Sequence, residues 1–160
     1  MEQPPRMIAD AMLGKLARWL RLLGFDVEYA LLDDAALAAR ARAEGRLLLT
    51  RDHGLATRRG LSVLLITSEH LDEQLRQVLD TVGYPDEHTQ PRCMECNVPL
   101  ESLTSAEAAP YVPPYVARTQ TRFRRCPRCG RITWPATHWA GIRRRLERAA
   151  PRLTNFLSSL

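Results

Sequence analysis

"MIADAMLGKLARWLRLLGFDVEYA", residues 7–30, is typical of a strand, a helix and a second strand. Residues 7–9 form a short apolar run, and residues 13–23 repeat apolar side chains at helical spacing. Gly24 stands where helices commonly end on a left-handed glycine. Residues 25–29 then alternate apolar and polar side chains, as a half-buried strand does. The stretch therefore predicts one strand–helix–strand unit of an α/β fold.

The following residues continue the same alternation of strands and helices. "RLLLT" (46–50) and "LSVLLIT" (61–67) are nearly continuous apolar runs, which are typical of parallel strands covered on both faces. An alanine-rich helix is expected over 35–44, and an apolar stripe predicts another helix over 71–82. The fold class we predict is α/β, a three-layer sandwich around a central parallel sheet.

Charge is unevenly distributed along the 160 residues, which suffice for one ordinary domain and a small appendage. Residues 1–89 carry a net charge of −3, and residues 90–160 carry +8. A basic tail on a mildly acidic body favours a polyanionic partner, nucleic acid before membrane. The alternative is an ordinary solvated surface in an arginine-biased chain, since 22 of the 23 basic residues are Arg.

Several classes of protein are disfavoured by what the sequence lacks. The first residues show no basic start followed by a long apolar run, and no stretch of about 18 apolar residues occurs. We therefore expect a soluble, cytoplasmic protein. No G-x-G-x-x-G follows the first predicted strand, and neither a P-loop nor a G-x-S-x-G is present. Metal-dependent hydrolysis is the leading chemistry that remains.

Aspartates follow three successive predicted strands. They are Asp10, the pair Asp33 and Asp34, and Asp52. The carboxyl ends of parallel strands meet at one edge of a sheet, where functional groups gather. Carboxylates brought together repel one another unless a cation lies among them, and oxygen ligands suit Mg²⁺ or Mn²⁺, which can activate water against a phosphodiester. For any one aspartate alone, a helix cap or turn former is the better interpretation, and it is the convergence of Asp10, Asp34 and Asp52 that favours a metal site.

Basic residues lie beside these aspartates on the first predicted helix. Lys15, Arg18 and Arg21 fall on the side opposite the apolar stripe, and this cationic side begins at the turn next to Asp10. We expect Lys15 and Arg18, with Arg51, to neutralise phosphates on either side of a scissile bond. For Arg21 an ordinary solvated position is an equal alternative.

Three stretches in combination carry a family resemblance: residues 7–30, the "DDAAL" that follows, and "LLLTRD" (47–52). In these stretches the sequence resembles the Mut-seven C-terminal RNase family, a compact relative of the PIN-domain nucleases. The resemblance covers residues 6–146 and implies a PIN-like lobe that cleaves RNA with a divalent metal. The metal ligands it implies are Asp10, Asp33 or Asp34, and Asp52. PIN domains usually have a fourth acid, for which Glu69 and Asp72 are the only loose candidates here.

Four cysteines form two matched C-x-x-C pairs. Cys93 and Cys96 precede Cys126 and Cys129, with 29 residues between the pairs. Four thiolates with this spacing suit a closed, tetrahedral and therefore structural Zn²⁺ site. Disulfides or a redox motif are the alternatives, although no secretion signal accompanies the cysteines. The resemblance also includes this tail, as a zinc ribbon with "VPPY" before the second pair and "WPATHW" after it.

Cationic and aromatic side chains interleave around the second cysteine pair. Arg122, Arg124 and Arg125 flank Phe123, and this composition is common where proteins hold phosphates and unpaired bases of RNA. For Trp134 and Trp139, packing inside the ribbon is the simpler interpretation. The segment "PYVPPYV" (110–116) is expected to be an extended, exposed loop.

These observations combine into one hypothesis. Residues 1–88 are expected to form a PIN-like nuclease domain, and residues 89–160 a zinc ribbon with a basic C-terminal helix. The predicted activity is hydrolysis of RNA with Mg²⁺ or Mn²⁺, catalysed by Asp10, Asp33, Asp34 and Asp52. The alternatives are a non-catalytic RNA-binding or ribosome-associated module, and a toxin-like nuclease controlled by a partner protein. A second copy of the chain is a further candidate partner, because Leu22 is an apolar residue among basic ones.

Overall fold

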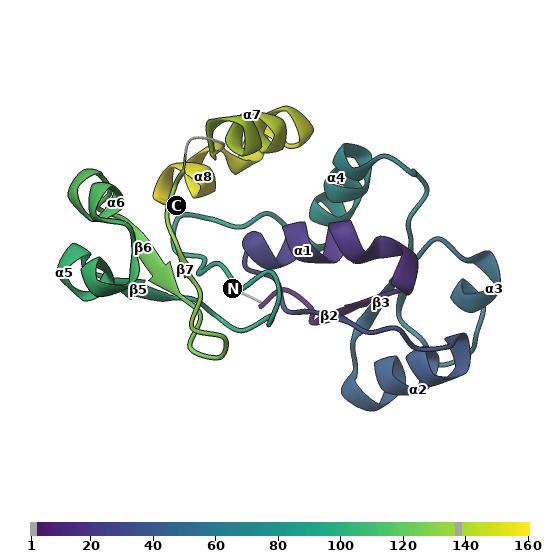
Figure 1. Ribbon diagram of the computed structural model, residues 1–160. Helices are drawn as coiled ribbons and strands as arrows, with labels where there is room; N and C mark the ends of the chain where they lie inside the picture. The colour runs from purple at the N-terminus through teal and green to yellow at the C-terminus, as the bar shows by residue number, and fades with distance from the viewer. Residues whose placement is uncertain (1–2, 137–138) are drawn as a thin grey trace.

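The computed structural model describes residues 3–136 and 139–160. Figure 1 shows a parallel sheet flanked by helices, a small antiparallel sheet beside it, and C-terminal helices that lie above both. The α/β class and the four-stranded parallel sheet confirm the fold predicted from the sequence. A four-cysteine cluster lies in the antiparallel part and is consistent with a zinc ribbon.

The central sheet consists of four short parallel strands. They are β1 (Met7–Ala9), β2 (Val27–Tyr29), β3 (Leu47–Thr50) and β4 (Val63–Leu65), in the order β2-β1-β3-β4. Ala9 pairs with Tyr29 on one side and with Leu49 on the other. Because β1 and β3 are neighbours in this register, the residues that follow Ala9 and Leu49 emerge side by side at the carboxyl edge.

Helices cover both faces of the sheet and produce the expected three layers (Figure 1). One face packs against α1 (Gly14–Leu22), which follows a 3₁₀ turn, η1 (Ala11–Leu13), and against α4 (Leu71–Val82). The other face packs against α2 (Asp34–Glu44) and α3 (His53–Ala56). Strand side chains alternate accordingly: Met7 and Ala9 join the first core, and Ile8 joins the second.

The smaller sheet contains β5 (Glu101–Leu103), β6 (Phe123–Arg125) and β7 (Ile132–Thr133), all antiparallel. Between β5 and β6 the chain forms α5 (Ser105–Ala108), η2 (Ala109–Tyr111) and α6 (Pro114–Thr119). The expected extended loop over 110–116 is therefore wrong. Pro110 is the second residue of η2 and Pro114 the first residue of α6, positions that tolerate proline because the first turn of a helix needs no backbone N–H donor.

The last helices return to the α/β lobe. They are α7 (Trp139–Ala149), η3 (Pro151–Leu153) and α8 (Thr154–Ser159). Leu153 and Phe156 are fully buried in the same core as α1 and α4. Arg145 Nε lies 2.9 Å from Asp72 Oδ1, and Arg76 donates to the carbonyl oxygen of Ala149. Since residues from both sides of position 88 share this core, the division into 1–88 and 89–160 stays a proposal.

A buried arginine joins the lobe to the first cysteine pair. Arg21 is only 7% exposed and donates from Nε to Val27 O and from Nη1 to Met94 O, each at 2.8 Å. Burial lowers the pKa of this guanidinium, whereas the nearby carboxylate of Glu28 acts in the opposite direction. The solvated position, one of the two alternatives for Arg21, is therefore wrong, because the carbonyl oxygens at the junction give the buried charge its partners.

Gly24 is required where α1 ends, and its replacement gives a test of the fold. Its φ is +92°, and a Cβ there would overlap Thr89 Cγ2 and lie 2.9 Å from Gln90 O. We expect Gly24→Ala to lower the free energy of unfolding by about 1–3 kcal/mol. Gly141→Ala is the control, because it meets open space inside α7 and is expected to raise stability slightly. Urea denaturation of both variants measures the difference, and equal midpoints would contradict the expectation.

Candidate active site and metal centre

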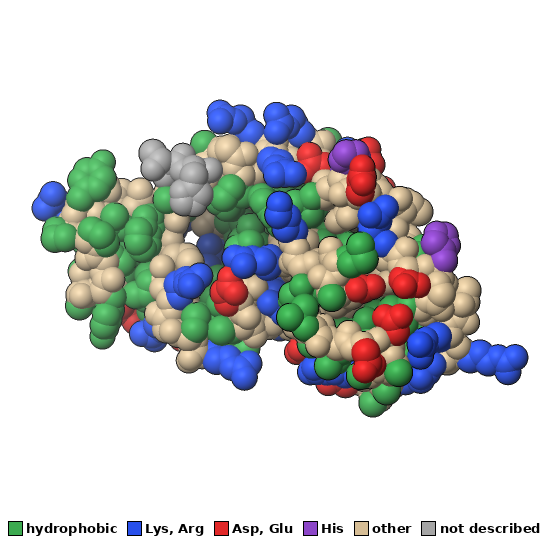
Figure 2. Space-filling model, turned by 45° about the vertical axis from the view of Figure 1, so that its right-hand side comes forward, with side chains coloured by type: hydrophobic (Ala, Val, Ile, Leu, Met, Phe, Trp, Pro, Cys, Tyr) green, Lys and Arg blue, Asp and Glu red, His purple; other side chains and the backbone are tan. Residues whose placement is uncertain are grey.

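The carboxyl edge of the parallel sheet carries the first candidate site. Asp10 follows β1 directly, and its amide donates to Leu49 O at 3.0 Å, which extends the pairing with β3 by one residue. Asp52 lies two residues beyond the end of β3. In Figure 2 several Asp and Glu side chains lie close together on the face of the α/β lobe.

Thr50 connects Asp10 with Asp52. Its fully buried side chain donates from Oγ1 to Asp10 Oδ2 at 2.8 Å and accepts from the amide of Asp52 at 3.0 Å. The hydroxyl thus fixes one carboxylate directly and the other through its backbone. Thr50 was missed by the sequence reasoning, although its place at the last strand position of "LLLTRD" is the signal that identifies it.

The aspartates also cap the helices that they precede. Asp10 accepts from the Met12 amide at 3.2 Å, Asp52 from Leu55 at 2.9 Å, and Asp33 from Ala36 at 2.8 Å. Asp34 is the exposed first residue of α2 and makes no side-chain hydrogen bond within the described residues. Of the neighbouring pair, Asp33 is therefore the cap.

The structure does not gather these carboxylates into a tight cluster. Among residues 3–136 and 139–160, one group of three or more His, Cys, Asp or Glu side chains has its ligand atoms within 4.8 Å of one another, and it consists of the cysteines. Asp10, Asp34 and Asp52 share the edge without meeting that distance. Their role as ligands of a catalytic metal stays a prediction.

The two candidates for a fourth acid occupy different surroundings. Asp72 forms an ion pair with Arg145 and so helps attach α7 to α4. Glu69 is exposed in the turn before α4. Neither arrangement singles out a fourth ligand.

The predicted phosphate-binding residues near the edge differ in what they contact. Lys15 is exposed on α1. Arg18 forms an ion pair with Glu95, with Nη2 2.7 Å from Oε1. Arg51 is half-buried, and its Nε is a buried nitrogen without a hydrogen-bond partner in the described part of the chain. Lys15 and Arg51 are thus available to an anionic ligand.

The arginines in and directly before β6 have contacts within the protein, two of them with the end of the chain. Arg122 donates to Ser158 O at 3.1 Å, and Arg124 donates to Leu160 O at 2.9 Å. Burial lowers the pKa of Arg124. Arg125 lies 3.6 Å from Glu101 on the neighbouring strand. These contacts attach α8 to the ribbon, in addition to any role in binding RNA.

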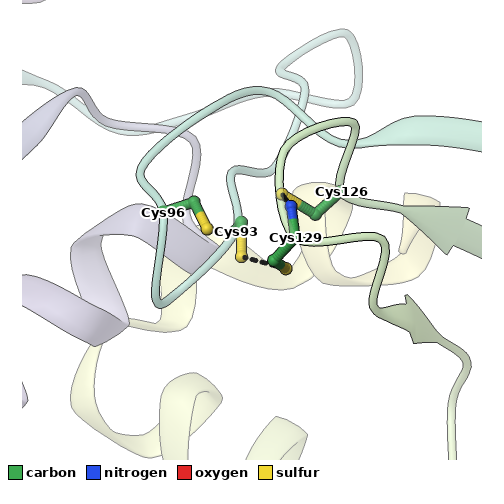
Figure 3. Close-up of side chains that lie close together, drawn as sticks. All are labelled: Cys93, Cys96, Cys126 and Cys129. Carbon is green, nitrogen blue, oxygen red and sulfur yellow. Dashed lines mark hydrogen bonds between the residues drawn. The ribbon is translucent and has the colours of Figure 1, made fainter.

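The four cysteines lie close together, as Figure 3 shows, and form a candidate metal centre. Cys93 Sγ lies 3.9 Å from Cys129 Sγ, close to the separation of about 3.8 Å that a tetrahedral site with Zn–S bonds of ~2.3 Å requires. Both pairs use the same turn: a residue with positive φ follows each second cysteine, Asn97 at +62° and Gly130 at +75°. The cysteines therefore fit a metal such as zinc.

The thiols of this cluster differ in acidity. Burial, together with the neighbouring thiols, raises the pKa of Cys96 to about 12. Burial acts in the same direction on Cys126, but hydrogen bonds from the amides of Cys129 and Arg128 outweigh it and lower that pKa to about 7. Four adjacent thiols cannot all ionise without a cation, so metal binding must displace protons from this site.

Comparison with known proteins gives one match. The family model described as Mut7-C RNAse domain matches residues 5–146. No curated protein and no solved structure matches the chain. No helix in the described part of the chain combines the length and apolar character needed to cross a membrane.

Proposed function

The chain belongs to the Mut7-C RNAse domain family, and we propose that it is a divalent-metal-dependent ribonuclease that hydrolyses RNA phosphodiesters. Membership of this family indicates a nuclease or RNA-related role. The structural observation that carries the proposal is the Thr50 hydroxyl, which connects Asp10 and Asp52 at the carboxyl edge of adjacent parallel strands.

In this proposal Asp10, Asp34 and Asp52 hold Mg²⁺ or Mn²⁺, with Asp33 shaping the turn as the cap of α2. The ion, when bound, lowers the pKa of a water molecule and stabilises the leaving oxygen. Oxygen donors on three different elements suit these ions, which keep several water ligands of their own. Thr50 orients Asp10 so that the carboxylate is positioned before the ion arrives.

The cationic residues have a separate task in the proposal. Lys15 lies in the first turn of α1, five residues after Asp10, and Arg51 adjoins Asp52 in sequence. With Arg18 they neutralise the phosphates next to the bond that is cleaved. Arg122, Arg124 and Arg125 add RNA contacts on the ribbon, whose four cysteines hold a structural Zn²⁺. We place this activity in the cytoplasm, where thiols stay reduced and available to zinc.

The Thr50 contact gives a prediction for the rate of cleavage. Thr50→Val keeps the shape of the side chain but removes the hydroxyl that holds Asp10 and the Asp52 amide. Loss of such an outer partner of a metal ligand is expected to reduce kcat/KM for RNA about 10- to 100-fold. Thr67→Val, near the end of β4, is the control and should leave kcat/KM unchanged. An unaltered rate in a folded Thr50→Val variant would contradict the proposed role.

A non-catalytic RNA-binding module is the second candidate function. Two observations favour it. The carboxylate oxygens of the aspartates do not form a cluster as close as that of the cysteine sulfurs, and Asp10, Asp33 and Asp52 serve as helix caps. It predicts that RNA binds without added Mg²⁺ or Mn²⁺ and stays intact at millimolar concentrations of either ion. Manganese titration followed by electron paramagnetic resonance separates the two candidates, because the nuclease requires a Mn²⁺ site that Asp10→Asn weakens.

A further inference from the structure

A cavity of about 230 Å³ lies where the lobe, the zinc ribbon and α7 meet. The last turn of α1, the first cysteine pair, β6, β7 and α7 all contribute to its wall. Two of the four cysteines, Cys93 and Cys126, line it, so the cavity adjoins the metal centre but does not coincide with it. A recess with Lys or Arg side chains is visible between the two parts of the molecule in Figure 2.

The wall of the cavity is strongly cationic. It contains five arginines, Arg18, Arg92, Arg122, Arg124 and Arg131, and one acidic residue, Glu95. Glu95 pairs with Arg18, so these two charges offset each other and the other four arginines carry the excess. Arg131 is exposed, and its guanidinium makes no hydrogen bond or ion pair within the described residues. The excess of positive charge favours an anionic ligand.

The remaining wall is apolar and aromatic. Trp134 packs against Phe123 with ring centroids 6.2 Å apart, and Trp139 begins α7; both indoles are half-buried and line the cavity. Leu22 lies on the same wall, which gives this residue a place other than a dimer contact. The volume is below the ~300–1,000 Å³ of pockets for drug-sized ligands. A planar base with one phosphate suits such a space, whereas a duplex does not.

The cavity lies away from the aspartates. It includes Arg18 and Leu22, from the second half of α1, whereas Asp10 precedes the helix. Along α1, Arg18 lies about 6 Å and Leu22 about 12 Å beyond Gly14, at ~1.5 Å per residue. A nucleotide bound in the cavity is therefore not the one at the scissile bond.

We propose that this cavity binds one unpaired nucleotide of the RNA, with its base against Trp134 and Trp139 and its phosphate at Arg131. The inference rests on the proposed function for its choice of RNA as ligand. It makes the enzyme selective for single-stranded RNA, and it fixes the distance between the unpaired nucleotide and the bond that is cleaved.

The test compares two arginines on the same turn of the ribbon. Arg131 lines the cavity, whereas Arg128 is also exposed but does not line it. The affinity of the zinc-loaded protein for a short single-stranded RNA is measured by fluorescence anisotropy without Mg²⁺ or Mn²⁺. Arg131→Ala is expected to weaken binding about tenfold and to reduce the salt slope by about 1, the loss of one phosphate contact. Arg128→Ala should change the affinity by less than about twofold.

Two further binding measurements test the contact between the RNA base and the tryptophans. Trp134→Leu is expected to weaken binding about fivefold or more, while Trp134→Phe retains most of the affinity because the ring remains. The same sequence as a duplex should bind at least about tenfold more weakly than the single strand. Equal losses in Arg131→Ala and Arg128→Ala, or equal affinities for duplex and single strand, would overturn the inference.

Failure of the proposed function is distinguishable from failure of the cavity. If the wild-type protein shows the expected binding pattern and cleaves no RNA, the cavity stands and the nuclease is rejected. If RNA is cleaved in an Asp10-dependent manner while Arg131→Ala binds like Arg128→Ala, the cavity alone is rejected.

Discussion

Asp10→Asn is expected to reduce the rate of RNA cleavage by more than about 100-fold. Removal of a residue that only hydrogen-bonds to a metal ligand costs up to about 100-fold, and Asp10 is itself a proposed ligand. The amide keeps the shape of the carboxylate: its oxygen can still accept from the Met12 amide, and its NH2 group, in the place of the other carboxylate oxygen, can donate to the Thr50 hydroxyl. What it lacks is the negative charge that a divalent ion requires. Folding and RNA affinity should therefore be nearly unchanged, while kcat collapses.

The control for this variant is Asp80→Asn. Asp80 is an exposed aspartate near the end of α4, where it accepts from the Tyr84 hydroxyl, away from the carboxyl edge of the sheet. The Asp80→Asn substitution removes the same negative charge as Asp10→Asn, but at a residue outside the proposed site. Single-turnover cleavage and anisotropy binding on both variants separate chemistry from affinity. Cleavage by folded Asp10→Asn at the wild-type rate would remove Asp10 from the active site.

Cys126→Ser is expected to abolish stable zinc binding, with the largest effect on structure of any single change. The serine hydroxyl does not ionise near neutral pH, so the site keeps three of its four ligands. Zinc stabilises small metal-binding folds by about 10–16 kcal/mol. The β5–β7 part has a small core formed around Leu103 and Phe123, and it should lose protection from hydrogen exchange before the central sheet does.

The same experiment includes Ser102→Ala, an exposed change on β5 that leaves all four cysteines intact. Metal analysis should find one zinc per chain in the control and in the wild type, and none in Cys126→Ser. Zinc retained at one equivalent in Cys126→Ser would contradict the four-cysteine site. Lowering the pH should also release the metal from the wild type, because thiols such as Cys96, whose raised pKa is about 12, must lose their protons to bind it.

The central sheet and its helices were predictable because local pattern and tertiary environment agree there. Strands such as β3 are buried on both faces and therefore consist of apolar residues, and the apolar stripe of α4 matches its bounds, Leu71–Val82. The four-cysteine cluster was predictable for a similar reason, since zinc imposes its own spacing on the chain.

Other features depend on contacts between distant residues, which the sequence pattern does not reveal. Arg21 has the helical position of a surface residue, but the carbonyl oxygens of Val27 and Met94 allow its burial. The prolines of 110–116 can begin helices as well as extended loops, and the outcome here is α6. Thr50 gains its role only through the register of β1 against β3.

Cleavage of RNA by the zinc-loaded wild-type protein, with and without added Mn²⁺ or Mg²⁺, tests the central claim most directly. Purified protein, freed of divalent ions other than zinc, is incubated with total cellular RNA, and the new ends are sequenced and their chemistry determined. We predict cuts that require the added ion and carry no 2′,3′-cyclic phosphate, because metal-activated water is the proposed nucleophile. Intact RNA at every ion concentration, or cleavage that persists without the ion, would contradict the account.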